Sequence, residues 1–208
     1  VAPDHQGTKA VTKQFSRLFE RDGVAFVGNV AIGGTPGGDL TVEDLGKMFD
    51  VVVLATGLDI DRSLGAAFDA VETVYGAGRV TRLWNGHPDE AGFEPQLGQS
   101  VLVVGNGNVA MDIVRLLAKG AEDLDGSDLG SETSDHGVSH IHLIGRSPAD
   151  KAKFDATMVR ELGKIAGLSV EMPALPSDGA TKTLADLAAL AGKTGDGRKT
   201  LSFHFNTR

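Results

Sequence analysis

The chain has 208 residues, 41% of them hydrophobic and 23% charged, which is the composition of a folded globular protein. Its formal net charge of −8 argues against nucleic acid as a general partner. The absence of cysteine excludes disulfides and thiol redox chemistry, so any electron transfer needs a bound cofactor, and it fits a cytoplasmic protein. No apolar run approaches a membrane span and no signal-peptide pattern opens the chain, so no membrane contact is expected.

The first half of the chain predicts short, separate elements. Apolar residues on one side of residues 10–20 predict a helix, and Thr41 is placed to cap a short helix that ends near Lys47. Val24–Val27 and Asp50–Leu54 are aliphatic runs that predict strands, the second of them buried. A stretch rich in Pro, Gly and acidic residues at 88–98 predicts a linker near a domain junction.

The most informative stretch combines a strand, a glycine turn and a helix. Val101–Val104 is a β-branched and aliphatic run, typical of a parallel strand that is buried on both faces. Gly105 to Ala110 then reads G-x-G-x-x-A, and an apolar helical stripe follows. In a dinucleotide site Gly105 permits the tight turn, Gly107 leaves room for a pyrophosphate, and Ala110 allows close helix–strand contact. A glycine turn without a ligand, or that of a methyltransferase, stays an open alternative.

The next predicted strand, 138–144, indicates which dinucleotide is bound. An NAD site usually has an acidic residue at the end of this strand, on the ribose 2′-OH, but here Arg146 and Ser147 follow Gly145. An arginine can hold a 2′-phosphate through charge-assisted hydrogen bonds, whereas a carboxylate would repel it. The sequence therefore predicts NADP, with an ordinary surface arginine as the alternative.

Residues 120–137 form an insert rich in carboxylates, Gly and Ser. Such a composition predicts a solvated loop. A metal site is the alternative, but the spacing does not match an EF-hand, and no metal is expected.

Glu161 is a candidate for proton handling in the last third of the chain. It shares a helical stripe with Phe154, Met158 and Ile165, which predicts a partly desolvated carboxylate suited to proton handling. The alternative is a residue at the edge of the stripe that pairs with a nearby lysine, Lys164 or Lys153. The elements predicted here are a helix over 150–164, a strand at 168–170, a helix over 183–190 and a strand at 200–205.

Several stretches together resemble adrenodoxin-reductase-like ferredoxin–NADP reductases, in order and in spacing, as far as about Leu168. The matching motifs are Val1-Ala-Pro-Asp-His5, Lys13-Gln-Phe15, Ala55-Thr-Gly57, Trp84-Asn-Gly-His-Pro88, Gly105-Asn-Gly-Asn-Val-Ala110 and Arg160-Glu-Leu162.

This resemblance implies an α/β fold: a Rossmann-like NADP-binding domain at 98–208 and, at 1–97, a partial FAD-binding domain with an inter-domain linker. It implies hydride transfer from NADPH to FAD and then electron transfer to ferredoxin or a similar iron–sulfur protein. By motif, the catalytic candidates are His5 and Glu161. The cofactor-binding candidates are Gly105, Gly107, Asn108, Val109, Ala110, Arg146, Ser147 and, as a weaker candidate, Arg62.

The chain also departs from the family pattern. Ser147 stands where the family often has a second arginine, and Met158 where it has a further acid. Neither the N-terminal FAD fingerprint nor the C-terminal segment of the FAD pocket is found, so we expect a fragment that binds NADP, does not retain FAD and is inactive alone. The alternatives are a free-standing NADP-binding sensing or docking module and a flavin-independent NADP-dependent dehydrogenase; the latter lacks Tyr-x-x-x-Lys, since Arg79 follows Tyr75.

Overall fold

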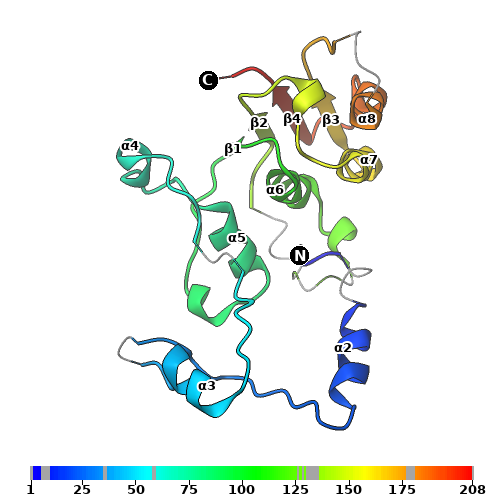
Figure 1. The fold of residues 1–208 in the computed structure, drawn as a ribbon. Helices are drawn as coiled ribbons and strands as arrows, with labels where there is room; N and C mark the ends of the chain where they lie inside the picture. The colour runs from blue at the N-terminus through cyan, green and yellow to red at the C-terminus, as the bar shows by residue number, and fades with distance from the viewer. Residues whose placement is uncertain are drawn as a thin grey trace. The chain divides into compact units, whose positions relative to one another are not determined.

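A computed structural model describes residues 2–5, 10–34, 37–57, 60–125, 127, 129, 136–176 and 181–207. The chain divides into two compact units. One contains residues 1–5 and 61–208, and the other contains residues 6–60. The two units are described separately below (Figure 1).

The larger unit is built on a four-stranded sheet in which every pairing is parallel. Its strands are β1 (Ser100–Val104), β2 (His140–Ile144), β3 (Leu168–Glu171) and β4 (Lys199–His204), in the spatial order β1-β2-β4-β3. Strand and helix alternate along the chain, as in doubly wound nucleotide-binding folds. The predicted α/β, Rossmann-like class is confirmed.

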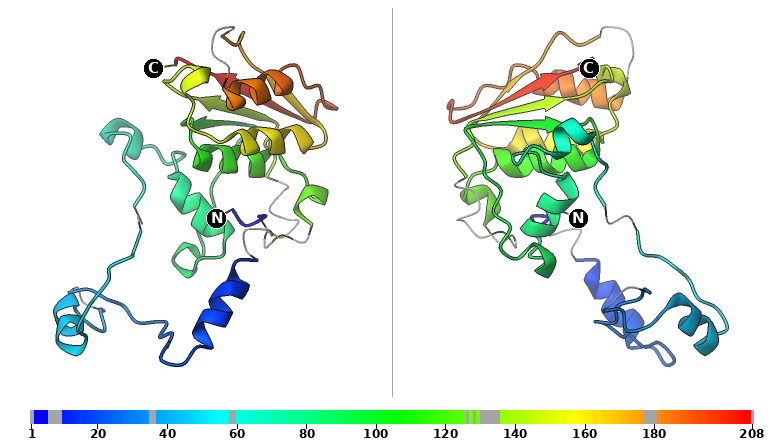
Figure 2. Two further views of the ribbon diagram at one scale, coloured as in Figure 1. Left: turned by 45° about the vertical axis from the view of Figure 1, so that its right-hand side comes forward. Right: turned by 90° about the vertical axis from the view of Figure 1, so that its left-hand side faces the viewer.

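One face of the sheet carries the core of this unit. The register aligns Val101, Ile141 and Leu201 across three strands, and the latter two are fully buried. Helices α6 (Asn108–Ala118) and α7 (Ala156–Lys164) pack side by side against this face, and α8 (Lys182–Leu190) packs against α7 (Figure 2). On the opposite face of β1, Leu102 and Val104 are more than half exposed, so the prediction of a strand buried on both faces is wrong.

The remaining helices of the larger unit precede or connect these elements. They are α4 (Ala66–Asp69), α5 (Ala77–Trp84) and the 3₁₀ turns Pro88–Glu90, Glu122–Leu124 and Ala149–Lys151. The Asp61 carboxylate accepts the backbone N–H groups of Gly78 and Arg79, which satisfies donors at the start of α5.

The helix predicted over 150–164 is divided in the structure into the 3₁₀ turn Ala149–Lys151 and the shorter helix α7. Of the predicted loop 120–137, residues 126, 128 and 130–135 lie outside the described residues.

The smaller unit contains α2 (Thr12–Phe19) and α3 (Val42–Met48). Thr41 caps α3 in a capping box with Asp44, as predicted. The strands predicted at 24–27 and 50–54 are wrong, because neither run is part of a strand in the structure. Val51 and Val53 are 77% and 80% exposed. A β-branched run forms a strand only where neighbouring strands accept its backbone hydrogen bonds, and the described residues of this unit contain only the isolated bridge Ile32–Leu40.

The compact division falls near residue 60, whereas the cofactor-based domain boundary is predicted at 97/98. Residues 61–97 share a unit with the sheet. Assigning residues 1–97 to FAD binding therefore stays a proposal. Among the described residues, no helix is long and apolar enough to cross a membrane.

Candidate functional site

The turn between β1 and α6 has the backbone that its glycines predict. Gly105 has φ of 137°, a conformation that L side chains rarely adopt, and a Cβ there would contact Ala110 Cβ at 3.7 Å. Gly107 is the N-cap of α6, and a Cβ built on it meets no atom within 4 Å. No side chain caps this helix and its first turn contains no acidic residue. The α6 N-terminus therefore combines open space with the positive end of the helix dipole.

Neighbouring side chains hold this turn in place. The Asn108 amide exchanges two hydrogen bonds of 2.8 Å with Asp155, one to its carboxylate and one from its backbone N–H. Asn106 packs against Gly145 so closely that any Cβ at position 145 would overlap it. The Asn106 carbonyl also accepts the backbone N–H of Lys153. These contacts therefore fix the position of the glycine turn relative to the end of β2.

The remaining cofactor-binding candidates are Arg146, Ser147, Val109 and Arg62. Arg146 is exposed and directly follows Gly145, while the Ser147 carbonyl accepts a long hydrogen bond of 3.4 Å from Asn106. Val109, in the first turn of α6, is 55% exposed. Arg62 is exposed ahead of α4, and no contact joins it to the turn.

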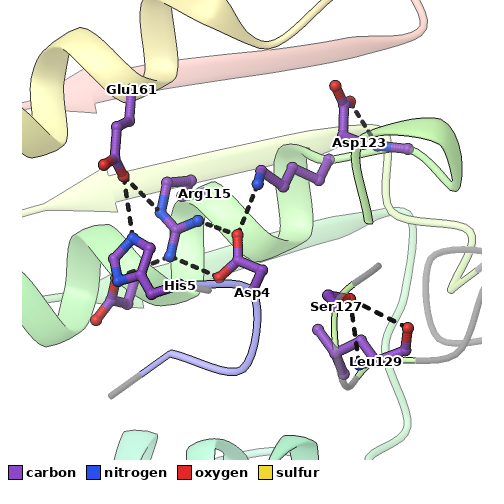
Figure 3. Close-up of polar contacts among 10 residues, drawn as sticks. Asp4, His5, Arg115, Asp123, Ser127, Leu129 and Glu161 are labelled. Atoms are coloured by element: carbon purple, nitrogen blue, oxygen red, sulfur yellow. Dashed lines mark hydrogen bonds and ion pairs between the residues drawn. The ribbon is translucent and has the colours of Figure 1, made fainter. Parts of the chain in front are cut away.

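The two catalytic candidates lie in direct contact. His5 Nε2 is 3.2 Å from Glu161 Oε2, although the residues are 156 positions apart in the sequence (Figure 3). Because an ionised carboxylate offers only acceptors, Nε2 must be the donor nitrogen. Both side chains are partly exposed, at 25% and 30%. Glu161 also forms an ion pair with Arg115, so its predicted alternative partners, Lys164 and Lys153, are wrong.

A buried ion cluster beside this pair escaped the sequence analysis. Both terminal nitrogens of Arg115 bond the Asp4 carboxylate, and one of them also bonds Asp112 at 3.0 Å. Lys119 Nζ bonds Asp4 at 2.6 Å. The side chains of Arg115 and Asp4 are each only 2% exposed. The one available signal was a charged residue inside the apolar run from Ile113 to Ala118.

Electrostatics keep this cluster ionised. Burial alone would raise the pKa of Asp4, but hydrogen bonds from Arg115 and Lys119, together with their charges, lower it to about 2. Burial likewise disfavours the charged form of Arg115, but Asp4 and Asp112 outweigh it and raise the pKa of that guanidinium. The cluster therefore fixes residues 2–5 on α6 through charged groups.

A cavity of about 270 Å³ opens over these groups. Its lining consists of Asp4, His5, Arg115, Lys119, Asp123, Glu161, Lys164 and Ile165. Both signs of charge meet there, because Lys119 and Lys164 line the same cavity as the carboxylates. Among the described residues, no group of three or more His, Asp or Glu side chains is arranged to hold a metal ion.

Comparison with known proteins identifies relatives over nearly the whole chain. No protein-family profile matches. Cindoxin reductase of Citrobacter braakii is 46% identical over 99% of this chain, and the mitochondrial NADPH:adrenodoxin oxidoreductase of Arabidopsis thaliana is 33% identical over 83%. The solved structure of Mycobacterium tuberculosis FprA in complex with NADPH aligns with a TM-score of 0.88 and 27% identity over 99% of this chain.

By descent the chain belongs to the adrenodoxin-reductase-like ferredoxin–NADP reductases. The resemblance in the sequence motifs is thereby confirmed. The chain spans between about a third and a half of the length of these relatives: 46% of cindoxin reductase, 36% of the Arabidopsis protein and 48% of FprA.

Proposed function

We propose that this chain binds NADP(H) at the N-terminus of α6, as the nucleotide-binding part of a ferredoxin–NADP reductase. The observation that carries the proposal is the open, uncapped helix start behind Gly105 and Gly107. Helix N–H donors and the helix dipole favour a pyrophosphate there. The exposed Arg146, at the end of the neighbouring strand, supplies the charge for a 2′-phosphate.

We assign His5 and Glu161 to the reacting end of the dinucleotide. Bound NADPH supplies a hydride, and the residues around it contribute position and electrostatics. The His5 imidazole donates toward Glu161 from the edge of the charged cavity, and Lys119 and Lys164 add positive potential. In the longer reductases the hydride would pass to FAD, its proton would be released, and its two electrons would leave one at a time to a ferredoxin-type iron–sulfur protein.

The residues of this chain alone do not fit a complete FAD site. No second glycine fingerprint is present, and the described part of residues 10–60 forms no sheet on which a flavin nucleotide would rest. We therefore assign no step to FAD in the isolated chain. Nucleotide binding without electron transfer is the expected behaviour.

Gly107→Ala tests the nucleotide site directly. The substitution adds a methyl group to open space at an ordinary φ of −116°, so the fold should be unaffected. It should weaken NADP⁺ binding roughly tenfold or more, because the pyrophosphate needs close approach to this backbone. Calorimetric titration with NADP⁺ measures the change. Gly98→Ala is the matched control, because a Cβ built on Gly98 also meets no atom within 4 Å and the residue precedes β1. This variant should bind NADP⁺ as the wild type does. Equal affinity of the two variants would refute the assigned site.

A further inference from the structure

One arginine, Arg115, bonds the residue that precedes His5 and also pairs with Glu161. The terminal nitrogens of Arg115 bond Asp4, the residue that precedes His5. Its Nε lies 3.3 Å from Glu161 Oε2, the same oxygen that faces His5. Figure 3 shows the guanidinium between the two carboxylates, with His5 beside it.

We infer that Arg115 is a positioning residue for the proposed hydride transfer: it holds the His5 imidazole against Glu161. The reaction itself rests on the proposed function. The positioning does not, because every contact that carries it joins residues of this chain to one another.

The geometry requires an arginine at this position. A guanidinium is a planar fork with five donors, so it can bond two Asp4 oxygens while its Nε faces a third carboxylate oxygen on Glu161. A lysine at 115 offers one compact ammonium and cannot serve Asp4 and Glu161 together. Lys119 already bonds Asp4, and it has no contact with Glu161. Arg115 is therefore the residue that links Asp4, which precedes His5, to Glu161.

The charge balance also points to Arg115. The cluster contains three carboxylates, Asp4, Asp112 and Glu161, and two cations, Arg115 and Lys119. A neutral residue at 115 would leave three carboxylates with one lysine, and repulsion would separate the segment of His5 from α6 and α7. A lysine at position 115 would keep the positive charge but would lose the planar set of guanidinium donors. Arg115→Lys therefore separates positioning from simple charge neutralisation.

The test measures how firmly His5 is held, in the full chain and without nucleotide. Diethyl pyrocarbonate modifies accessible imidazoles, and mass spectrometry gives the rate at each histidine. In Arg115→Lys we expect the rate at His5 to rise roughly tenfold relative to His140, the loss typical of one charge-assisted hydrogen bond. His140 is exposed on β2 and serves as the internal reference.

Two further variants control the result. Arg160→Lys changes the neighbour of Glu161, a half-exposed arginine that pairs with Asp186, and should leave the His5 rate unchanged. Asp4→Asn weakens the ion pair between Asp4 and Arg115 by removing the carboxylate charge, and it should also raise the His5 rate. This variant keeps the test valid if Arg115→Lys fails to fold.

The outcomes separate this inference from the proposed function. The His5 rate is measured without nucleotide, so it does not depend on whether or how tightly the chain binds NADP⁺. An unchanged His5 rate in folded Arg115→Lys and Asp4→Asn would overturn the inference, as would an equal rise at every histidine, which indicates general unfolding. Failure of the wild-type chain to bind NADP⁺ would refute the proposed function and leave the His5 result standing.

Discussion

Asp4 shows how a single residue that is far from the sheet in the sequence contributes to the site. Its carboxylate is almost fully buried, yet it stays ionised because Arg115 and Lys119 both bond it. A buried ion pair is costly to form and more costly to break from one side, because the remaining charge is then unpaired. The segment that contains His5 is therefore held by electrostatics as well as by the burial of Ala2.

The lowered pKa of Asp4 makes stability depend on acid pH. The pKa falls from 3.8 to about 2 on folding, which contributes about 2 kcal/mol to the free energy of unfolding. A depressed pKa means that this contribution is complete above the unfolded value and is lost as the pH falls through the folded value. Urea unfolding should show Asp4→Asn less stable than wild type at pH 7, with the difference shrinking between about pH 4 and pH 2. A difference that is constant over this range would contradict the ionised, paired Asp4.

The site residues could be predicted from sequence only where the pattern is local. Periodicity placed Glu161 on a stripe with Met158, and the motif resemblance indicated His5. Asp4 and Arg115 are 111 positions apart, and no local pattern predicts a contact between them. The alternative in which Glu161 pairs with Lys164 or Lys153 is wrong for the same reason, because Arg115 is far from Glu161 in the sequence.

At the scale of elements, the sequence predicted best those segments whose partners also lie in this chain. The strand at Val101–Val104, the glycine turn and α6 form at the predicted places, because β1 pairs with β2 and packs one of its faces against α6. The runs at 24–27 and 50–54 have the same aliphatic composition but no strand partners. Composition gives a preference for extended backbone, whereas hydrogen bonding to a neighbouring strand decides whether a sheet forms.

Hydrogen exchange should separate these two classes of segment. Backbone amides of Ile141 and Leu143 in β2 bond neighbouring strands in the core and should exchange slowly. Amides of Val51 to Val53 have no strand partner and should exchange close to the rate of an unfolded chain. Mass spectrometry of peptic peptides reports both in one experiment. Equal protection of the two segments would contradict the lack of strand pairing at residues 51–53.

At the scale of the molecule, the central claim is that the larger unit is an NADP-selective nucleotide-binding domain. The most direct measurement is calorimetric titration of the wild-type chain and of Arg146→Ala with NADP⁺ and with NAD⁺. We predict that the wild type prefers NADP⁺. We predict that Arg146→Ala loses roughly tenfold in affinity for NADP⁺ with little change for NAD⁺, because only NADP⁺ carries the 2′-phosphate that we propose this guanidinium bonds. Equal binding of both nucleotides, or an unaltered preference in the variant, would contradict the role of Arg146, and binding of neither would contradict the account as a whole.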